Sequence, residues 1–263
     1  MNTLKLVDLT VSVEGKTILN NFNLEINSGE IHVLMGPNGV GKSTLTKVII
    51  GDPNYKIESG SIYYNDILLN DKSVDERSRL GIFLGMQLPP EIEGVTNADF
   101  LRTAVSIREK ENFKLFDFIT NIDNTVSKLD MNEDIIHRDV NKGFSGGERK
   151  KNEILQMYIL KPNMVMLDEI DSGLDVDSLK IVGNSVMDYY KANKPGILLI
   201  THYERLLDYI KPTHVHILKN GTIVKSGDYS LVKEIEKNGF KEENDNKYVS
   251  IGTCAIKESI KNE

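Results

Sequence analysis

The stretch Gly36-Pro37-Asn38-Gly39-Val40-Gly41-Lys42-Ser43-Thr44 decides the fold of this chain. An apolar run at residues 31–35 precedes it, and a helix-like run at residues 45–50 follows it. The glycines let the backbone curl so that consecutive N–H groups point at phosphate oxygens, and a helix N-terminus adds its positive dipole end. The spacing therefore predicts a phosphate-binding loop, with Lys42 on the β- and γ-phosphates and Ser43 on Mg²⁺. A glycine-rich turn before an ordinary helix is the alternative, and the Lys-Ser pair disfavours it.

Composition narrows the class of protein. The chain has 263 residues, 40% of them apolar, which allows one large α/β domain or two closely joined subdomains. Its 39 acidic and 32 basic residues give a net charge of −7, so we expect neither nucleic acid nor an anionic membrane surface as a partner. The apolar runs are far shorter than the roughly 20 residues that cross a bilayer, so we expect no direct membrane insertion.

The N-terminus and the single cysteine bear on the compartment. Residues 1–6 show neither the apolar core of a signal peptide nor an Arg/Ser-rich transit segment. We therefore expect a cytoplasmic bacterial protein, or one of the plastid stroma if a transit peptide has been removed. Cys254 cannot form an internal disulfide, and alone it cannot hold an iron–sulphur cluster or a zinc ion.

Two kinds of strand are expected. Alternation at residues 4–7 and 22–26 predicts short antiparallel strands before the loop, and residues 61–65 continue that sheet. Unbroken apolar runs at residues 164–167 and 197–200 are typical of buried parallel strands. The sequence therefore predicts an α/β fold with a parallel-sheet core.

A helical insertion interrupts that core. Residues 88–94 contain two prolines and are expected to form a stiff linker, and apolar residues recur at helical spacing from 97 to about 129. After the core, residues 215–218 and 222–224 predict a hairpin, and 231–237 a last helix.

Two carboxylates follow one of the buried runs, in Met164-Val165-Met166-Leu167-Asp168-Glu169. They are expected at the carboxyl edge of a parallel sheet, beside the phosphate-binding loop. Asp168 is then placed to hold Mg²⁺, and Glu169 to orient or deprotonate a water that attacks the γ-phosphate. On their own, two such acids more often begin a helix or face solvent. The loop at 36–44 favours the catalytic role.

A second rare pattern is Phe144-Ser145-Gly146-Gly147-Glu148. Ser145 can cap a helix while Glu148, three positions later, reaches back to it, as in a capping box. The glycines leave backbone N–H groups open to an anion. The basic residues that follow, 149–151, would by themselves indicate only a solvated face.

These patterns occur in the order found in the ATP-binding cassette (ABC) family, which the chain resembles from residue 1 to about 240. The landmarks are residues 36–44, Gln87, Ser145-Gly146-Gly147, Asp168-Glu169, Ser172-Gly173-Leu174-Asp175 and Thr201-His202. The resemblance implies a P-loop ATPase with a RecA-like parallel-sheet core, an N-terminal antiparallel β subdomain and a helical subdomain. We accordingly expect one domain over 1–240, with residues 88–160 as the inserted helical subdomain, and a polar tail over 241–263.

The resemblance also assigns roles. In this family Gln87 joins Ser43 and Asp168 around Mg²⁺ and links the nucleotide site to the helical subdomain, and His202 contacts the γ-phosphate. With Lys42 and Glu169, these two residues would form the catalytic set. Ser145, Gly146, Gly147 and Asp175 would complete the ATP site of an opposite copy, in an ATP-dependent head-to-tail pair.

Departures from the common pattern point to one branch of the family. Glu148 stands where transporter ATPases usually have Gln, and Ile170-Asp171 stands where they usually have Pro-Thr. Both segments resemble the ATPase subunits of the SUF iron–sulphur cluster assembly system, whose partners are SufB-like and SufD-like scaffold proteins reshaped by ATP-driven dimerisation. The nucleotide-binding subunit of a membrane transporter is the main alternative, and a nucleic-acid-acting cassette is a weaker one.

Three further expectations concern single positions. Val13 stands where the family usually stacks an aromatic residue on adenine, so discrimination between ATP and GTP should be weak. In similar proteins a lysine at the position of Lys150 holds the catalytic glutamate away from the nucleotide, which implies a weak, partly exposed ion pair with Glu169. The histidines at 32, 137, 214 and 216 show no metal-ligand spacing with carboxylates or cysteine and are expected to be structural.

Overall fold

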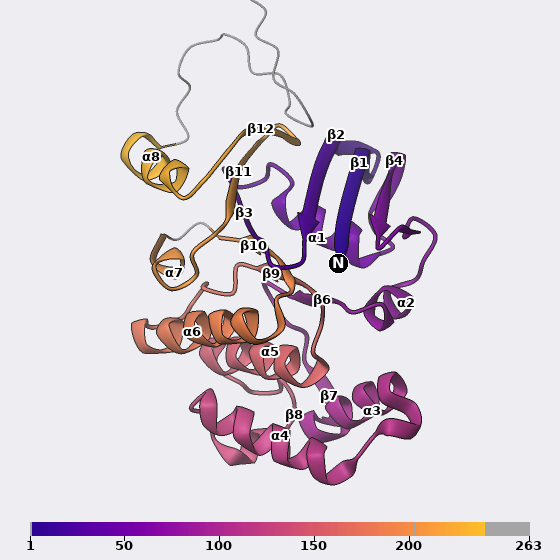
Figure 1. Ribbon diagram of the computed structural model, residues 1–263, viewed down its shortest axis with the longest axis vertical. Coiled ribbons are helices and arrows are strands. Elements are labelled where there is room, and N and C mark those ends of the chain that lie inside the picture. Colours follow the sequence, from indigo (N-terminus) through magenta and orange to yellow (C-terminus); the bar gives the residue numbers. More distant parts are fainter. Residues whose placement is uncertain (1, 202–203, 240–263) are drawn as a thin grey trace, which may run out of the picture.

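A computed structural model describes residues 2–201 and 204–239 of the chain (Figure 1). A six-stranded sheet with the order β12-β11-β3-β10-β9-β6 forms its centre, and every neighbouring pair is parallel except β11–β12. The predicted parallel core and the C-terminal hairpin are therefore confirmed. The strands are β3 (Ile31–Met35), β6 (Ile82–Gly85), β9 (Met164–Asp168), β10 (Gly196–Ile200), β11 (His214–Lys219) and β12 (Thr222–Gly227).

A second, antiparallel sheet contains the N-terminal strands, as expected. Its order is β2-β1-β4-β5, and it lies beside the core sheet in Figure 1. One hydrophobic core joins it to helix α1 and to one face of the core sheet. The strands are β1 (Thr3–Val13), β2 (Lys16–Asn27), β4 (Lys56–Tyr64) and β5 (Ile67–Leu68), and α1 is Lys42–Ile50.

The core strands are buried on both faces, which explains their unbroken apolar runs. In β9, Met164 and Met166 face the core shared with the N-terminal sheet, whereas Val165 and Leu167 face a second core. Side chains alternate between the two faces of a strand, so a strand covered on both sides must be apolar at every position. The second core is closed by helices α5 (Gly146–Leu160) and α6 (Val176–Asn193) and extends into the helical part.

The helical part lies at one end of the molecule (Figure 1). It contains α3 (Asn97–Glu109), α4 (Leu115–Lys128) and the short 3₁₀ segments Lys110–Asn112 and Glu133–Ile136. The α4 residues Phe118, Ile122 and Val126 recur at helical spacing and are buried against the second core. The predicted helical insertion is thus observed.

The expected linker at 88–94 is partly wrong. Residues Ile92–Thr96 form strand β7, which pairs with β8 (Asp139–Val140) to make a small antiparallel sheet. The prolines at 89 and 90 precede this strand, and proline at such a position removes no ladder hydrogen bond. The helical part is therefore closed at its base by backbone pairing between its two ends.

The remaining helices are α2 (Val74–Arg79), α7 (Glu204–Tyr209) and α8 (Ser230–Asn238), the last of which matches the predicted final helix. His202, the tail over 241–263 and Cys254 lie outside the described residues. Among the described helices, none combines the length and apolar character needed to cross a membrane.

A close helix–helix contact positions α7, the helix that follows β10 along the chain. A Cβ atom placed on Gly183 of α6 would lie 2.7 Å from Cβ of Tyr209 in α7. Real side chains do not approach so closely, so a larger residue at 183 must push the two helices apart.

Gly183→Ala should therefore destabilise the protein by about 1–3 kcal/mol, because overpacking outweighs the gain of about 1 kcal/mol that this change normally gives inside a helix. Urea unfolding of the full chain measures the effect. Lys180→Ala, on the exposed side of the same helix, is the control and should change stability by less than about 0.5 kcal/mol. A Gly183→Ala variant as stable as the wild type would contradict the packing argument.

Candidate active site

The loop between β3 and α1 has the backbone that its glycines predict. Gly36 adopts φ of 155°, and a Cβ atom there would lie 2.3 Å from the backbone oxygen of Leu218 in β11. Gly39 and Gly41 also have positive φ, at 79° and 105°. A side chain at Gly36 would collide with the neighbouring strand, so the loop depends on glycine there.

The N-terminus of α1 is open to an anion. Gly41 occupies the N-cap position without a side-chain hydrogen bond, and the first turn contains no acidic residue. The backbone N–H groups of a helix start are positively polarised and have no intrahelical acceptor. A phosphate group at this point would satisfy them.

Lys42 lies at the same point, with 6% of its surface exposed. Its ammonium donates hydrogen bonds to the backbone oxygens of Gly36 and Pro37, both at 2.8 Å. Burial lowers the pKa of Lys42, and the nearby charges of Glu169 and Asp168 act in the opposite direction. The cation is therefore held over the loop, close to both acids of the predicted site.

Ser43 and Asp168 contact each other, although they are far apart in the sequence. The Ser43 hydroxyl donates to Oδ1 of Asp168 at 3.2 Å, and the Thr46 hydroxyl donates to Oδ2 at 3.3 Å. Asp168 is buried, and burial raises its pKa while the bond from Ser43 opposes that shift. Two oxygen ligands of the type that Mg²⁺ prefers thus converge beside the loop.

Glu169 directly follows β9, at the same edge of the core sheet. Its backbone has φ of 49°, and its N–H donates to the carbonyl oxygen of Ile200 at 2.9 Å. Nε2 of Gln87 donates to Oε2 of Glu169 at 2.5 Å. The structure therefore brings the expected glutamate and glutamine into contact. Gln87 reaches Glu169 from a position two residues past the end of β6.

Lys150 lies elsewhere than the sequence predicted. It is 4% exposed, and its ammonium donates to the backbone oxygens of Met86, at 2.5 Å, and Gln87, at 2.8 Å. Glu153 is its acidic partner at 3.6 Å and also accepts the N–H of Met86. The expected partly exposed pair with Glu169 is thus replaced by a buried pair with Glu153, because α5 packs its Lys150 face against the end of β6.

This buried pair holds the backbone that carries Gln87. Burial raises the pKa of Glu153 to about 7, and the charge of Lys150 lowers it in part. Burial also lowers the pKa of Lys150 itself. Both groups are hydrogen-bonded to the segment 86–87, so they fix the position from which Gln87 reaches Glu169.

The predicted capping box at Ser145 is present at the start of α5. Ser145 Oγ accepts from the N–H of Glu148 at 3.2 Å, and the Glu148 carboxylate accepts from the N–H of Ser145 at 2.8 Å. Asp175 caps α6 with its own side chain, which accepts from the N–H of Ser178 at 2.7 Å without a reciprocal bond.

Ser145, Gly146, Gly147 and Asp175 line one groove, together with residues of the helical part. No residue of the phosphate-binding loop lines that groove. Within one chain the structure therefore gathers the expected site residues into two separate groups.

Some contacts could not be expected from the spacing of the motifs. Thr46 reaches Asp168 from the first turn of α1, and the Thr201 hydroxyl donates to Oδ2 of the buried Asp171 at 2.7 Å. Thr46 could have been found from the sequence as a polar residue one helical turn after Ser43, on the buried side of α1. His202, the last expected catalytic residue, lies outside the described part of the chain.

Relatives of known sequence cover almost the whole chain. The chain is 48% identical over 242 residues to a probable ABC transporter ATP-binding protein of Streptococcus pyogenes serotype M3, covering 91% of this chain and 94% of the relative. It is 47% identical over 241 residues to vegetative protein 296 of Bacillus subtilis, covering 91% and 92%. It is 46% identical over 241 residues to the probable ATP-dependent transporter SufC of Escherichia coli, covering 90% and 97%.

Solved structures share the fold. The dimeric structure of MJ0796, described as a bacterial ABC transporter cassette, superposes with a TM-score of 0.74 at 20% identity, covering 86% of this chain and 98% of that one. An ATP-binding subunit of an ABC transporter gives a TM-score of 0.74 at 24% identity, covering 89% and 93%. The family model described as ABC transporter matches residues 19–172. The chain therefore belongs to the ABC family and is an ATP-hydrolysing cassette with the α/β fold of P-loop NTPases.

Proposed function

We propose that this chain is the Mg²⁺-dependent ATPase subunit of an iron–sulphur cluster assembly complex of the SUF type. The contact between Ser43 and Asp168 carries the catalytic part of the proposal, because it joins the phosphate-binding loop to the acids that follow β9. The similarity to SufC over 90% of the chain supports the assembly role.

Binding would begin at the loop. The phosphates of ATP would lie on the N-terminus of α1, where no side chain caps the helix and the first N–H groups have no intrahelical acceptor. Lys42 would exchange the carbonyl oxygens of Gly36 and Pro37 for β- and γ-phosphate oxygens. Its buried position lets this single cation act with little screening by solvent.

Mg²⁺ fits the oxygen atoms that converge beside the loop. Ser43 and Asp168 would hold it, with Gln87 in reach from the end of β6. When bound, the ion neutralises charge on the phosphate oxygens. Asp168 would then bind the metal instead of accepting hydrogen bonds from the hydroxyl groups of Ser43 and Thr46.

Glu169 would act on the attacking water. Its carboxylate is held by Gln87 at the carboxyl edge of the sheet, next to the metal ligand Asp168. A carboxylate in this position can orient the water and accept its proton as the bond to the γ-phosphorus forms. His202, one residue after Thr201, is proposed to contact the γ-phosphate.

Glu169→Gln should bind ATP normally and lower hydrolysis by about 100-fold or more, because a neutral amide cannot accept the proton. Lys42→Ala should lose ATP binding or turnover. Phosphate release and binding of a fluorescent ATP analogue measure the two effects. Glu58→Gln, an exposed acid in β4, is the control. Wild-type hydrolysis by Glu169→Gln would remove Glu169 from the water-activating role.

Two copies would form a complete site. Within one chain the groove at Ser145, Gly147 and Asp175 is separate from the loop at 36–44, so each lacks what the other offers. In a head-to-tail pair, the N-terminus of α5 at Ser145 of one copy would face the γ-phosphate held by the other. The paired arrangement of MJ0796, which shares the fold, is compatible with this proposal.

The Glu169→Gln variant should elute as a dimer in the presence of ATP and Mg²⁺, because unhydrolysed ATP would hold the two copies together. Adding Ser145→Arg should abolish that dimer by blocking the anion site, whereas Thr103→Arg, exposed on α3, should not. Size-exclusion chromatography with light scattering distinguishes the species. Full hydrolysis by a preparation shown to be monomeric would exclude the paired site.

Scaffold partners would dock on the helical part. Phe116 of α4 is 80% exposed and Leu88, directly after Gln87, is 85% exposed. A partner that covers such residues could move segment 86–87 and, through Gln87, the carboxylate of Glu169. We propose SufB-like and SufD-like proteins as these partners, reshaped when two copies of this chain pair, in the bacterial cytoplasm or the plastid stroma.

A purified SufB–SufD-type complex from the same source should stimulate ATP hydrolysis several-fold. Phe116→Asp should remove the stimulation but leave basal hydrolysis intact, whereas Ile67→Asp, on the N-terminal sheet, should change neither the stimulation nor basal hydrolysis. The names of two relatives, a probable ABC transporter ATP-binding protein and a probable ATP-dependent transporter, also favour a second candidate, the nucleotide-binding subunit of a transporter. Stimulation by a membrane component, with none by the scaffold complex, would favour that candidate instead.

A further inference from the structure

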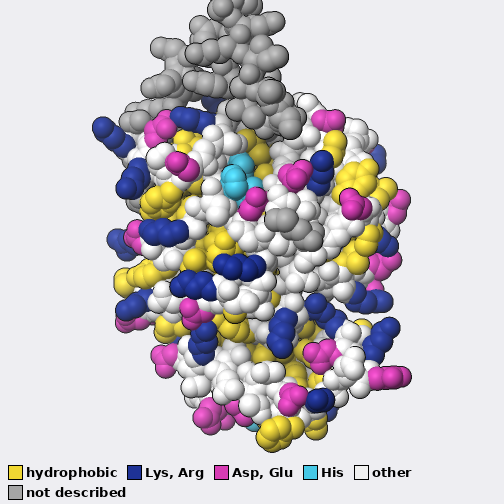
Figure 2. Space-filling model, in the orientation of Figure 1, with side chains coloured by type: hydrophobic (Ala, Val, Ile, Leu, Met, Phe, Trp, Pro, Cys, Tyr) yellow, Lys and Arg dark blue, Asp and Glu magenta, His cyan; other side chains and the backbone are white. Residues whose placement is uncertain are grey.

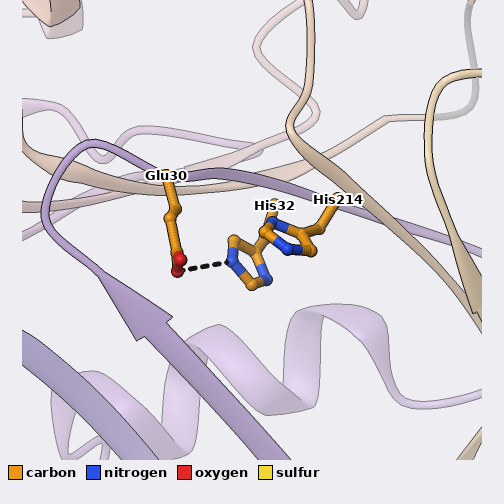
Figure 3. Close-up of side chains that lie close together, drawn as sticks. All are labelled: Glu30, His32 and His214. Carbon is orange, nitrogen blue, oxygen red and sulfur yellow. Dashed lines mark hydrogen bonds and ion pairs between the residues drawn. The ribbon is translucent and has the colours of Figure 1, made fainter.

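A histidine cluster lies at the amino ends of β3 and β11, which the spacing of these histidines in the sequence did not indicate. Glu30 and His32 are two residues apart and lie on one face of the strand. His214 pairs directly with His32 in the β3–β11 register. Figure 3 shows the side chains of Glu30, His32 and His214 close together.

Ligand atoms of these three residues converge. Nε2 of His32 lies 3.1 Å from Oε2 of Glu30, and one ligand atom from each of Glu30, His32 and His214 lies within 4.8 Å of the others. The rings of His32 and His214 are stacked with their centroids 4.3 Å apart. Ligands of a tetrahedral zinc ion lie roughly 3.4 Å apart, so the three side chains have to rearrange around a bound ion, and the His214 ring has to turn out of its stack on His32.

A second layer of hydrogen bonds fixes the buried ring. Nδ1 of His32 lies 2.9 Å from Nε2 of His216, whose Nδ1 lies 2.8 Å from Oγ of Ser226. This row of hydrogen bonds is compatible with both tautomers of His32. When His32 Nε2–H donates to Glu30, Ser226 donates to His216 and His216 donates to Nδ1 of His32. When Nε2 binds a metal, Nδ1–H of His32 donates to His216 instead, and His216 donates to Ser226. Ligating histidines are typically held in this second way.

The environment suits a bound cation. His32 is 3% exposed, whereas Glu30 is partly exposed and His214 is exposed, so an ion would be held from inside and reached from solvent. Figure 2 shows histidine side chains at the surface of this face.

We propose that Glu30, His32 and His214 form a site for a first-row transition metal of the Zn²⁺ type, with at least one coordination position open. The two imidazoles and one carboxylate select such metals over Mg²⁺ and Ca²⁺, which prefer oxygen ligands alone. The site lies at the amino end of β3, opposite the phosphate-binding loop at its carboxyl end. It is therefore distinct from the Mg²⁺ site of the ATPase and independent of the SUF assignment.

The test uses the full chain carrying Cys254→Ser, so that no thiolate contributes. After treatment with a chelator and without nucleotide, Zn²⁺ is titrated in competition with a chromophoric chelator, and Co²⁺ is titrated to record its visible absorption. We expect one equivalent to bind, the absorption intensity of Co²⁺ with nitrogen and oxygen ligands, and a higher thermal unfolding midpoint with Zn²⁺.

His214→Ala and Glu30→Gln should each lower Zn²⁺ affinity by at least about tenfold and remove the Co²⁺ absorption, with ATP hydrolysis in Mg²⁺ unchanged. Both side chains are outside the buried core, so the variants should fold, which circular dichroism verifies. His137→Ala, an exposed histidine in the helical part, is the matched control and should bind like the parent. No stoichiometric Zn²⁺ binding by the parent, or equal affinity in His214→Ala and the parent, would overturn the site.

Discussion

The parallel pairing of β10 with both β3 and β9 is the constraint on which the rest of the structure depends. Ile197 to Ile200 pair with Ile31 to Leu34 on one side and with Val165 to Asp168 on the other. This register brings the carboxyl ends of β3 and β9 to one edge, where the loop and Asp168 meet. The N–H of Glu169 is hydrogen-bonded to the last residue of β10, so the turn that carries the proposed catalytic glutamate takes its position from this strand.

Four charged side chains at the site are buried. Lys42, Lys150, Glu153 and Asp168 are all nearly inaccessible, and each has a hydrogen-bond partner on the backbone or on a neighbouring side chain. Buried ion pairs are costly to desolvate and seldom increase stability relative to apolar residues. The value of the Lys150–Glu153 pair lies in position, because it fixes the backbone at 86–87 before any substrate arrives, while backbone carbonyl groups hold Lys42 over the loop.

The features that were predictable from the sequence are those set by short spacing. The loop at 36–44, the acids after β9 and the capping box at Ser145 each depend on fewer than about ten neighbouring residues, and local chemistry sufficed for all three. Strand β7 was missed because its partner, β8, lies more than forty residues later. The histidine cluster depends on contacts between residues 184 apart, which alternation along one strand cannot reveal. The burial of Lys150 likewise follows from how α5 packs on β6.

The approach of Gly36 to the backbone oxygen of Leu218 has a consequence for how sequences of this fold can vary. The obstacle to a side chain at position 36 is a carbonyl group, which every residue at position 218 would present in the same place. No replacement at 218 can therefore compensate for the loss of the glycine. The two positions touch, yet they have no pair of side chains that could change together, so correlated substitutions among relatives would leave this contact invisible.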